Sequence, residues 1–156
     1  MTIADVNTME GRVFPARRQT KNLVGGTSPV TCKNFNLGYV VLEPQGGQVP
    51  WHNQEQEEIY MILDGTGEMC IDEEIQTVNA GQMVFIPPHA FHQLTNIGDT
   101  PLKMMYCYGP AGDVAHWRQE LSGTLPREGV DAPPLPEGAW PQCVDPPTVT
   151  TPDGTS

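Results

Sequence analysis

Basic residues are scarce in this sequence. Among its 156 residues, 8 Lys and Arg stand against 19 Asp and Glu, which gives a formal net charge of −11 at pH 7. Nucleic acids and anionic membrane surfaces repel a chain with this balance. The composition therefore argues against both classes of partner and says nothing about the fold.

Long apolar runs and paired cysteines are also missing. No stretch approaches the roughly 18 apolar residues that a membrane helix needs, and the first thirty or so residues hold no apolar core of a secretory signal. The cysteines are scattered and form no CxxC pair. We therefore expect a soluble cytoplasmic protein whose thiols are free and act as small hydrophobic side chains. The four cysteines are Cys32, Cys70, Cys107 and Cys143.

Short apolar stretches recur about every ten residues through the middle of the chain. Turn residues separate them, including Asp64 with Gly65, a strong hairpin signal, and Pro87 with Pro88. Antiparallel sandwiches and barrels have this pattern, so we predict an all-β fold. The predicted strands cover residues 37–42, 58–63, 67–71, 75–78, 83–86, 92–96 and 102–108.

The composition divides the chain into four segments. Residues 1–34 are polar and hold five of the eight basic groups, which predicts an N-terminal arm that docks on the acidic body or on a partner subunit. Residues 35–110 hold the strands of a single domain, and residues 111–125 include a short helix that Gly123 ends. Residues 126–156 hold eight of the sixteen prolines, which predicts an extended Pro-rich tail that is packed on the surface or partly disordered.

One polar cluster lies just ahead of a predicted strand. Residues two apart in a strand point to the same face, so His52 and Gln54 share a face. Glu58 joins them if the strand resumes after a short turn, whereas Glu55 and Glu57 point to solvent. Parity therefore separates three inward polar side chains from two outward carboxylates.

His92 begins a later predicted strand and can face the same interior. Two imidazoles and one carboxylate are ordinary ligands of divalent metals, and this set with open positions is typical of non-haem Fe(II). The chain has only four histidines, so the pattern singles out His52, Glu58 and His92 as metal ligands. Gln54 is either a fourth ligand through its amide oxygen or a hydrogen-bond partner that orients Glu58 or a bound water.

The spacing around these residues resembles the two motifs of the cupin superfamily. The resemblance implies a small jelly-roll barrel with one metal ion inside, and it assigns the metal role to His52, Glu58 and His92. Two positions depart from the family pattern, because Gln54 replaces a second histidine and His89 replaces a glycine. The first motif is carried by Gly46, His52, Gln54, Glu58 and Gly65, and the second by Gly81, Pro87, His92 and Asn96.

Three further side chains are candidates for catalysis. Tyr60 shares the parity of Glu58 and should line the barrel near the metal, and Tyr106 faces inward if Lys103 faces out. Both are either core packing or hydrogen-bond partners of a ligand, since a buried phenol needs a partner. His89 is either a surface turn residue or a proton carrier at the barrel mouth, because a free imidazole titrates near neutrality.

Two other aromatic positions have structural interpretations. His116 lies beside Trp117 on the predicted helix, where we expect it to be structural. Trp51 has the opposite parity to His52, which would place it at a subunit interface.

Three classes of function fit these residues. The first is a metal-dependent enzyme acting on a small organic molecule, with an Fe(II) dioxygenase-like oxidoreductase as the leading interpretation and Mn, Zn or Ni as other candidates for the divalent metal. The second keeps the metal without the redox step, as a lyase, isomerase or cyclase. The third is a small-ligand-binding protein that is not an enzyme.

The sequence also suggests the kind of substrate and partner. No Arg or Lys falls clearly on an inward position, which favours an aromatic or largely apolar substrate. Sheet edges of small jelly rolls need cover, so we expect a homodimer in which the N-terminal arm and the Pro-rich tail pair across a two-fold axis.

Overall fold

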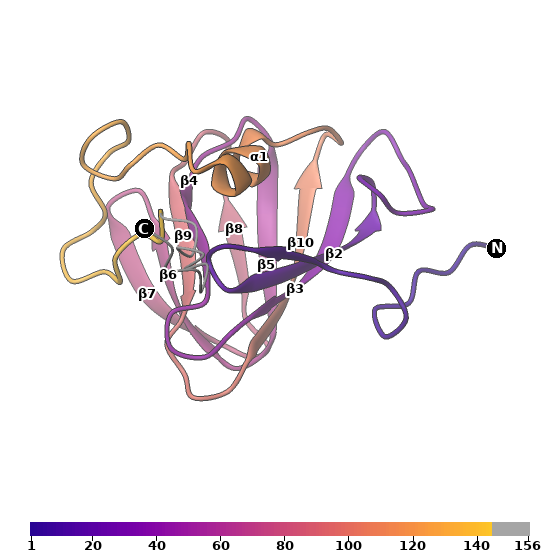
Figure 1. Ribbon diagram of the computed structural model, residues 1–156, viewed down its shortest axis with the longest axis horizontal. Coiled ribbons are helices and arrows are strands. Elements are labelled where there is room, and N and C mark those ends of the chain that lie inside the picture. Colours follow the sequence, from indigo (N-terminus) through magenta and orange to yellow (C-terminus); the bar gives the residue numbers. More distant parts are fainter. Residues whose placement is uncertain (145–156) are drawn as a thin grey trace, which may run out of the picture.

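A computed structural model describes residues 1–144 of the chain, and the last part of the Pro-rich tail, residues 145–156, lies outside the described residues. Two antiparallel sheets face each other, and one short helix lies over one end of them (Figure 1). The elements are β1 (Arg12–Phe14), β2 (Arg18–Val24), β3 (Asn36–Leu42), β4 (Gln48–His52), β5 (Glu57–Asp64), β6 (Thr66–Ile71), β7 (Glu74–Asn79), β8 (Met83–Ile86), β9 (His92–Asn96), β10 (Leu102–Gly109) and α1 (Ala115–Ser122).

The strand order confirms the jelly-roll prediction. The six-stranded sheet runs β1-β2-β3-β10-β5-β8 and the four-stranded sheet runs β4-β9-β6-β7. Strands close in sequence, such as β4 and β5, lie in different sheets, as expected when an antiparallel barrel is wound from two layers. This winding brings the ends of β4, β5 and β9 together, and these strands carry the predicted metal ligands.

The N-terminal segment is more ordered than the sequence suggested. Residues 1–34 contain two strands, and β2 pairs with β3 through Arg18 with Leu42 and Thr20 with Val40. The inward positions of β2 include Arg18 and Thr20, which are both buried. Because polar residues stand where a core strand normally has apolar ones, the sequence shows no apolar period of two here, and no strand was predicted in residues 1–34.

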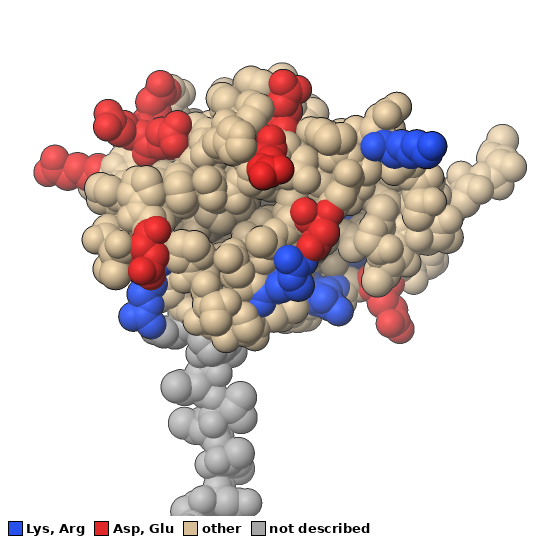
Figure 2. Space-filling model, turned by 90° about the horizontal axis from the view of Figure 1, so that it is seen from above, with Lys and Arg blue, Asp and Glu red and all other residues tan. Residues whose placement is uncertain are grey.

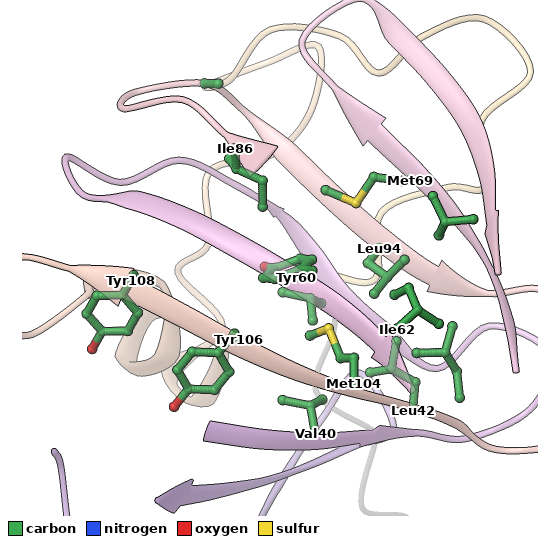
Figure 3. Packing of buried hydrophobic residues seen from close by; sticks show 14 of the residues in the cluster. Val40, Leu42, Tyr60, Ile62, Met69, Ile86, Leu94, Met104, Tyr106 and Tyr108 are labelled. Atoms are coloured by element: carbon green, nitrogen blue, oxygen red, sulfur yellow. The ribbon is translucent and has the colours of Figure 1, made fainter. Parts of the chain in front are cut away.

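The core fills the space between the sheets. Inward residues of β10 alternate with partly exposed ones, and Met104 pairs with Ile62 while Tyr106 pairs with Tyr60 across the β10–β5 ladder. Leu94 from the opposite sheet packs in the same cluster (Figure 3). This alternation confirms the parity predicted for β10 and sets the direction in which Glu58 and Tyr60 point.

The first half of the Pro-rich tail covers the outer face of the four-stranded sheet. Gln93 donates to the Trp140 carbonyl at 2.8 Å, and Gln48 donates to the Pro141 carbonyl at 2.9 Å. Trp51 is fully buried and donates from its indole nitrogen to the Pro133 carbonyl at 2.9 Å. The prediction that Trp51 lies at a subunit interface is therefore wrong, because the chain's own tail covers this side chain.

Helix α1 lies across the end of the barrel where β4, β5 and β9 meet (Figure 1). Gly123 ends it in a left-handed conformation, with φ 69°, which costs glycine no steric strain. A buried ion pair fixes the helix to β2, since Arg18 Nη2 lies 2.5 Å from Glu120 Oε2. The backbone amide of Ala16 also donates to Glu120 Oε1 at 3.2 Å.

Acidic side chains are spread around the molecule when it is viewed from the side of α1 (Figure 2). Within residues 1–144, no helix is long and apolar enough to cross a membrane.

Candidate metal centre

Three side chains from three strands meet under α1. His52 ends β4, and His92 begins β9 and pairs with His52 in register. Glu58 lies near the start of β5. One ligand atom from each of these residues lies within 4.8 Å of the other two. The ring centroids of His52 and His92 are 4.1 Å apart, and His92 Nε2 lies 3.3 Å from Glu58 Oε2.

Backbone carbonyls fix the tautomer of both imidazoles. His52 Nδ1 lies 2.7 Å from the Pro50 carbonyl, and His92 Nδ1 lies 3.0 Å from the Ala90 carbonyl. Because a carbonyl only accepts, each Nδ1 carries the proton and donates it. Each Nε2 therefore presents a lone pair to the interior, which is the tautomer that a metal needs.

These lone pairs have no partner among the described residues. The Nε2 atoms of His52 and His92 and Oε2 of Glu58 are buried without a hydrogen bond. His92 Nε2 and Glu58 Oε2 are close enough for an ion pair, yet both are acceptors in the tautomer above, so no proton joins them unless Glu58 is protonated. Buried acceptors that converge in this way are costly, and a divalent cation between them would remove that cost. The residues present therefore fit a metal ion.

The electrostatics of the site favour neutral groups when no cation is bound. Burial raises the pKa of Glu58, and the nearby His92 partly offsets this effect. Burial and the neighbouring His92 lower the pKa of His52 well below its ordinary value. A bound cation would reverse the first effect, because it stabilises the carboxylate form of Glu58.

Gln54 lies at the rim of the same cluster. Its side chain is 9% exposed, and among the described residues neither its amide oxygen nor its amide nitrogen has a hydrogen-bond partner. The amide oxygen is thus available to a metal or to a water bound there. Gln54 also lines a surface depression of about 410 Å³ together with Asn53 and His89.

The three predicted catalytic residues occupy different places. Tyr60 is buried edge-on to His92, with ring centroids 5.8 Å apart. Tyr106 is also buried, but its hydroxyl donates to Asn22 Oδ1 at 2.8 Å. Burial raises the pKa of both phenols, so neither is a base near neutral pH. His89 is exposed, with φ 66°, and faces the depression outside Gln54 rather than the three-residue cluster.

The structure adds two residues that the sequence did not point to. His116 of α1 stacks on His52 with ring centroids 3.7 Å apart and an interplanar angle of 27°. Arg18 is 2% exposed and faces inward, so the expectation that no basic side chain points inward is wrong. A sequence signal for α1 exists in retrospect, because its buried residues, His116 and Glu120, are polar and four apart on one helix face.

Known proteins share both the sequence pattern and the fold. Residues 38–108 match the cupin domain. These residues form a cupin domain. The chain is 41% identical to the uncharacterized protein MJ1618 of Methanocaldococcus jannaschii over 68 residues. The aligned segment covers 43% of this chain and 54% of that protein. The match thus spans about half the length of that relative.

Solved structures confirm the cupin fold at low sequence identity. The DMSP lyase DddQ of Ruegeria pomeroyi superimposes with a TM-score of 0.59 at 24% identity, over 69% of this cupin and 58% of that chain. The polyketide cyclase RemF of Streptomyces resistomycificus superimposes with a TM-score of 0.60 at 16% identity, over 71% and 80% of the two chains. At these identities the likeness establishes the fold alone.

Acid should destabilise the metal-free protein partly through His116. Burial, with His52 nearby, lowers the pKa of His116 in the folded protein well below 6.5. In the unfolded chain the pKa of a histidine is about 6.5. The unfolded state therefore binds the extra proton as the pH falls below about 6.5, and stability drops. Between pH 7 and pH 5 the protein should lose about 2 kcal/mol more than a His116→Phe variant.

Urea unfolding of both proteins in the presence of a chelator, at pH 7 and pH 5, measures this difference. An equal loss of stability in the two proteins would show that His116 takes up its proton in the folded state. The comparison with the variant is needed because Glu58 and Glu120, whose pKa values burial raises, act in the opposite direction.

Proposed function

We propose that this cupin is a metal-dependent enzyme that acts on a small organic molecule. His52, Glu58 and His92 would hold one divalent ion, with Gln54 at a fourth position or bonded to a water on the metal. The observation that carries the proposal is the convergence of three buried acceptor atoms within 4.8 Å. Two imidazoles and one carboxylate with open positions favour Fe(II) and dioxygenase-like oxidation.

The protein residues would prepare the site for such chemistry. A bound divalent ion supplies a Lewis acid and, in the case of iron, an electron carrier. The Pro50 and Ala90 carbonyls orient the two imidazoles, while Glu58 supplies the negative charge. Tyr60 stays neutral beside His92 and can donate a hydrogen bond to a substrate oxygen. Helix α1 covers the site and excludes bulk water.

A reaction without oxidation is the second candidate. It is supported by fold neighbours that are named as a lyase and a cyclase, and one fold can host many chemistries. In this case His52, Glu58 and His92 would hold an ion that supplies a Lewis acid, and a proton would have to move without help from an ionised tyrosine. His89 is suited to exchange that proton with solvent, because it is exposed at the depression that Gln54 lines.

Reconstitution of the apoprotein distinguishes these candidates. The protein is loaded anaerobically with Fe(II), Mn(II), Zn(II) or Ni(II) and incubated with a panel of small aromatic and carboxylate substrates, with and without oxygen. Oxygen uptake that requires both Fe(II) and a substrate supports oxidation, whereas anaerobic turnover with Mn(II) or Zn(II) supports the second candidate. Ligand binding without turnover under any condition would contradict both and leave a binding protein.

Gln54 should set the metal affinity of the site. A Gln54→His variant replaces a neutral amide with an imidazole, which is a better ligand for Zn(II) and Ni(II). We expect affinity for these ions to rise about tenfold or more, on the scale at which groups around a metal alter binding. Competition with a chromogenic chelator measures the change, and Asn53→His, at an exposed neighbouring position, is the control. Equal affinities in both variants would exclude Gln54 from the metal.

A further inference from the structure

A small cavity lined by several polar side chains lies beside the candidate metal site. The cavity holds about 20 Å³, and its walls include Glu58, Tyr60, Tyr106, Tyr108 and His116. Tyr106 donates to Asn22, and Tyr108 donates to the Gly112 carbonyl at 2.7 Å. Among the described residues that line the cavity, the buried side-chain atoms left without a hydrogen bond are Glu58 Oε2 and His116 Nδ1.

The position of His116 is held from several sides. Its ring stacks on His52, and the ring of Trp117 lies next to it, with centroids 5.8 Å apart. The ion pair of Glu120 with Arg18 fixes the helix one turn further on. Phenylalanine could make the same ring contacts without burying an unpaired nitrogen, which costs free energy. This cost indicates that Nδ1 of His116 has a hydrogen-bond partner in the functional state of the protein.

We propose that His116 forms a binding subsite for an oxygen of a molecule that coordinates the metal. His116 and the metal ligand Glu58 line the same cavity, and Nδ1 of His116 is buried without a hydrogen bond. The volume of this cavity suits one water molecule or one ligand oxygen. The oxygen would bind the ion on one side and accept a hydrogen bond from Nδ1 on the other. Small carboxylates and other oxyanions are the ligand class that this geometry fits. The inference rests on the proposed metal site.

Arg18 and Glu120 are not expected to influence which class of ligand binds. Arg18 lines the cavity, but Nη2 is paired with Glu120 and Nη1 donates to the Gln48 carbonyl at 3.2 Å. Its charge is therefore already matched within the fold. The hydrogen bond from His116 is then the contact from α1 that distinguishes an oxyanion from an apolar ligand.

Formate, the smallest carboxylate, is the probe for this subsite. The Co(II)-loaded protein is titrated with sodium formate, and the visible absorption of Co(II) reports both metal binding and formate binding. His116→Phe keeps the ring stack and should bind Co(II) within threefold of the original protein but formate at least tenfold more weakly. His116→Asn places an amide nitrogen near Nδ1 and should recover most of the formate affinity. Arg118→Gln, on the exposed face of α1, should match the original protein.

Each other result contradicts a defined part of the proposal. Equal formate affinity in His116→Phe, or no spectral response of the original protein to formate, would exclude the subsite. A tenfold loss of Co(II) affinity in His116→Phe would show that the residue acts on the metal itself. Failure of the original protein to bind Co(II) would remove the metal site and the subsite together, so the two failures are distinguishable.

Discussion

A His92→Ala variant is expected to bind divalent metal at least about 100-fold more weakly than the original protein. Groups that only orient a metal ligand are typically worth about 10- to 100-fold in affinity, and His92 would supply a ligand atom directly. Its side chain is fully buried, the Ala90 carbonyl fixes its tautomer, and Nε2 lies 3.3 Å from Glu58 Oε2. Isothermal titration of the apoprotein with Zn(II) or Co(II) measures the loss.

His89→Ala is the matched control for this variant. His89 is exposed and lies outside the group of convergent ligand atoms, so its removal should change metal affinity by less than about threefold. If His92→Ala retained the affinity of the original protein, or if both variants lost it equally, the two-imidazole site would be wrong.

An Arg18→Met variant is expected to lower the free energy of unfolding by about 3–5 kcal/mol. The change leaves the Glu120 carboxylate buried without its partner, because both side chains of the pair are at most 2% exposed. It also removes the guanidinium that lies 4.2 Å from the centroid of the Phe14 ring. Since the pair joins β2 to α1, the cover over the metal site should loosen as well.

The preceding residue provides the control. Arg17 pairs with Glu43 at 3.1 Å, but the two side chains are 47% and 63% exposed, so Arg17→Met should cost less than about 1 kcal/mol. The double variant Arg18→Met with Glu120→Leu should regain most of the lost stability, because no buried charge is left alone. Urea unfolding of the three variants measures these values. Equal losses in Arg17→Met and Arg18→Met would show that burial does not control the strength of the pair.

Part of the three-residue cluster could be predicted because β5, which carries Glu58, alternates between buried and more exposed positions. Glu58 follows from that parity, and the predicted outward positions of Glu55 and Glu57 are exposed. His52 ends β4, which is buried at every position, so the spacing of the motif, rather than alternation, pointed to it. The turn at Asp64 and Gly65 could also be predicted, and β5 ends at Asp64. Local sequence was sufficient at these positions because each signal needs only its immediate neighbours.

The missed features depend on contacts between distant segments. No local pattern indicated that Arg18 is buried, because its partner, Glu120, is 102 residues away. His116 lies on a helix whose buried face is polar, so no apolar stripe indicated what it faces. Trp51 was expected at a subunit interface because its parity is opposite to that of His52. The segment around Pro133 that covers it has no periodicity from which its docking could be predicted. In each case the tertiary contact, rather than the local pattern, determined the environment.

The metal content of the protein, expressed without added metal, tests the central claim most directly. Elemental analysis of the purified full-length chain should find about one divalent ion per chain, with iron favoured by the ligand set. A variant with both His52→Ala and Glu58→Gln should contain almost none while remaining folded by circular dichroism. An original protein that holds no metal and takes up none on reconstitution, or a double variant that holds as much, would contradict the account.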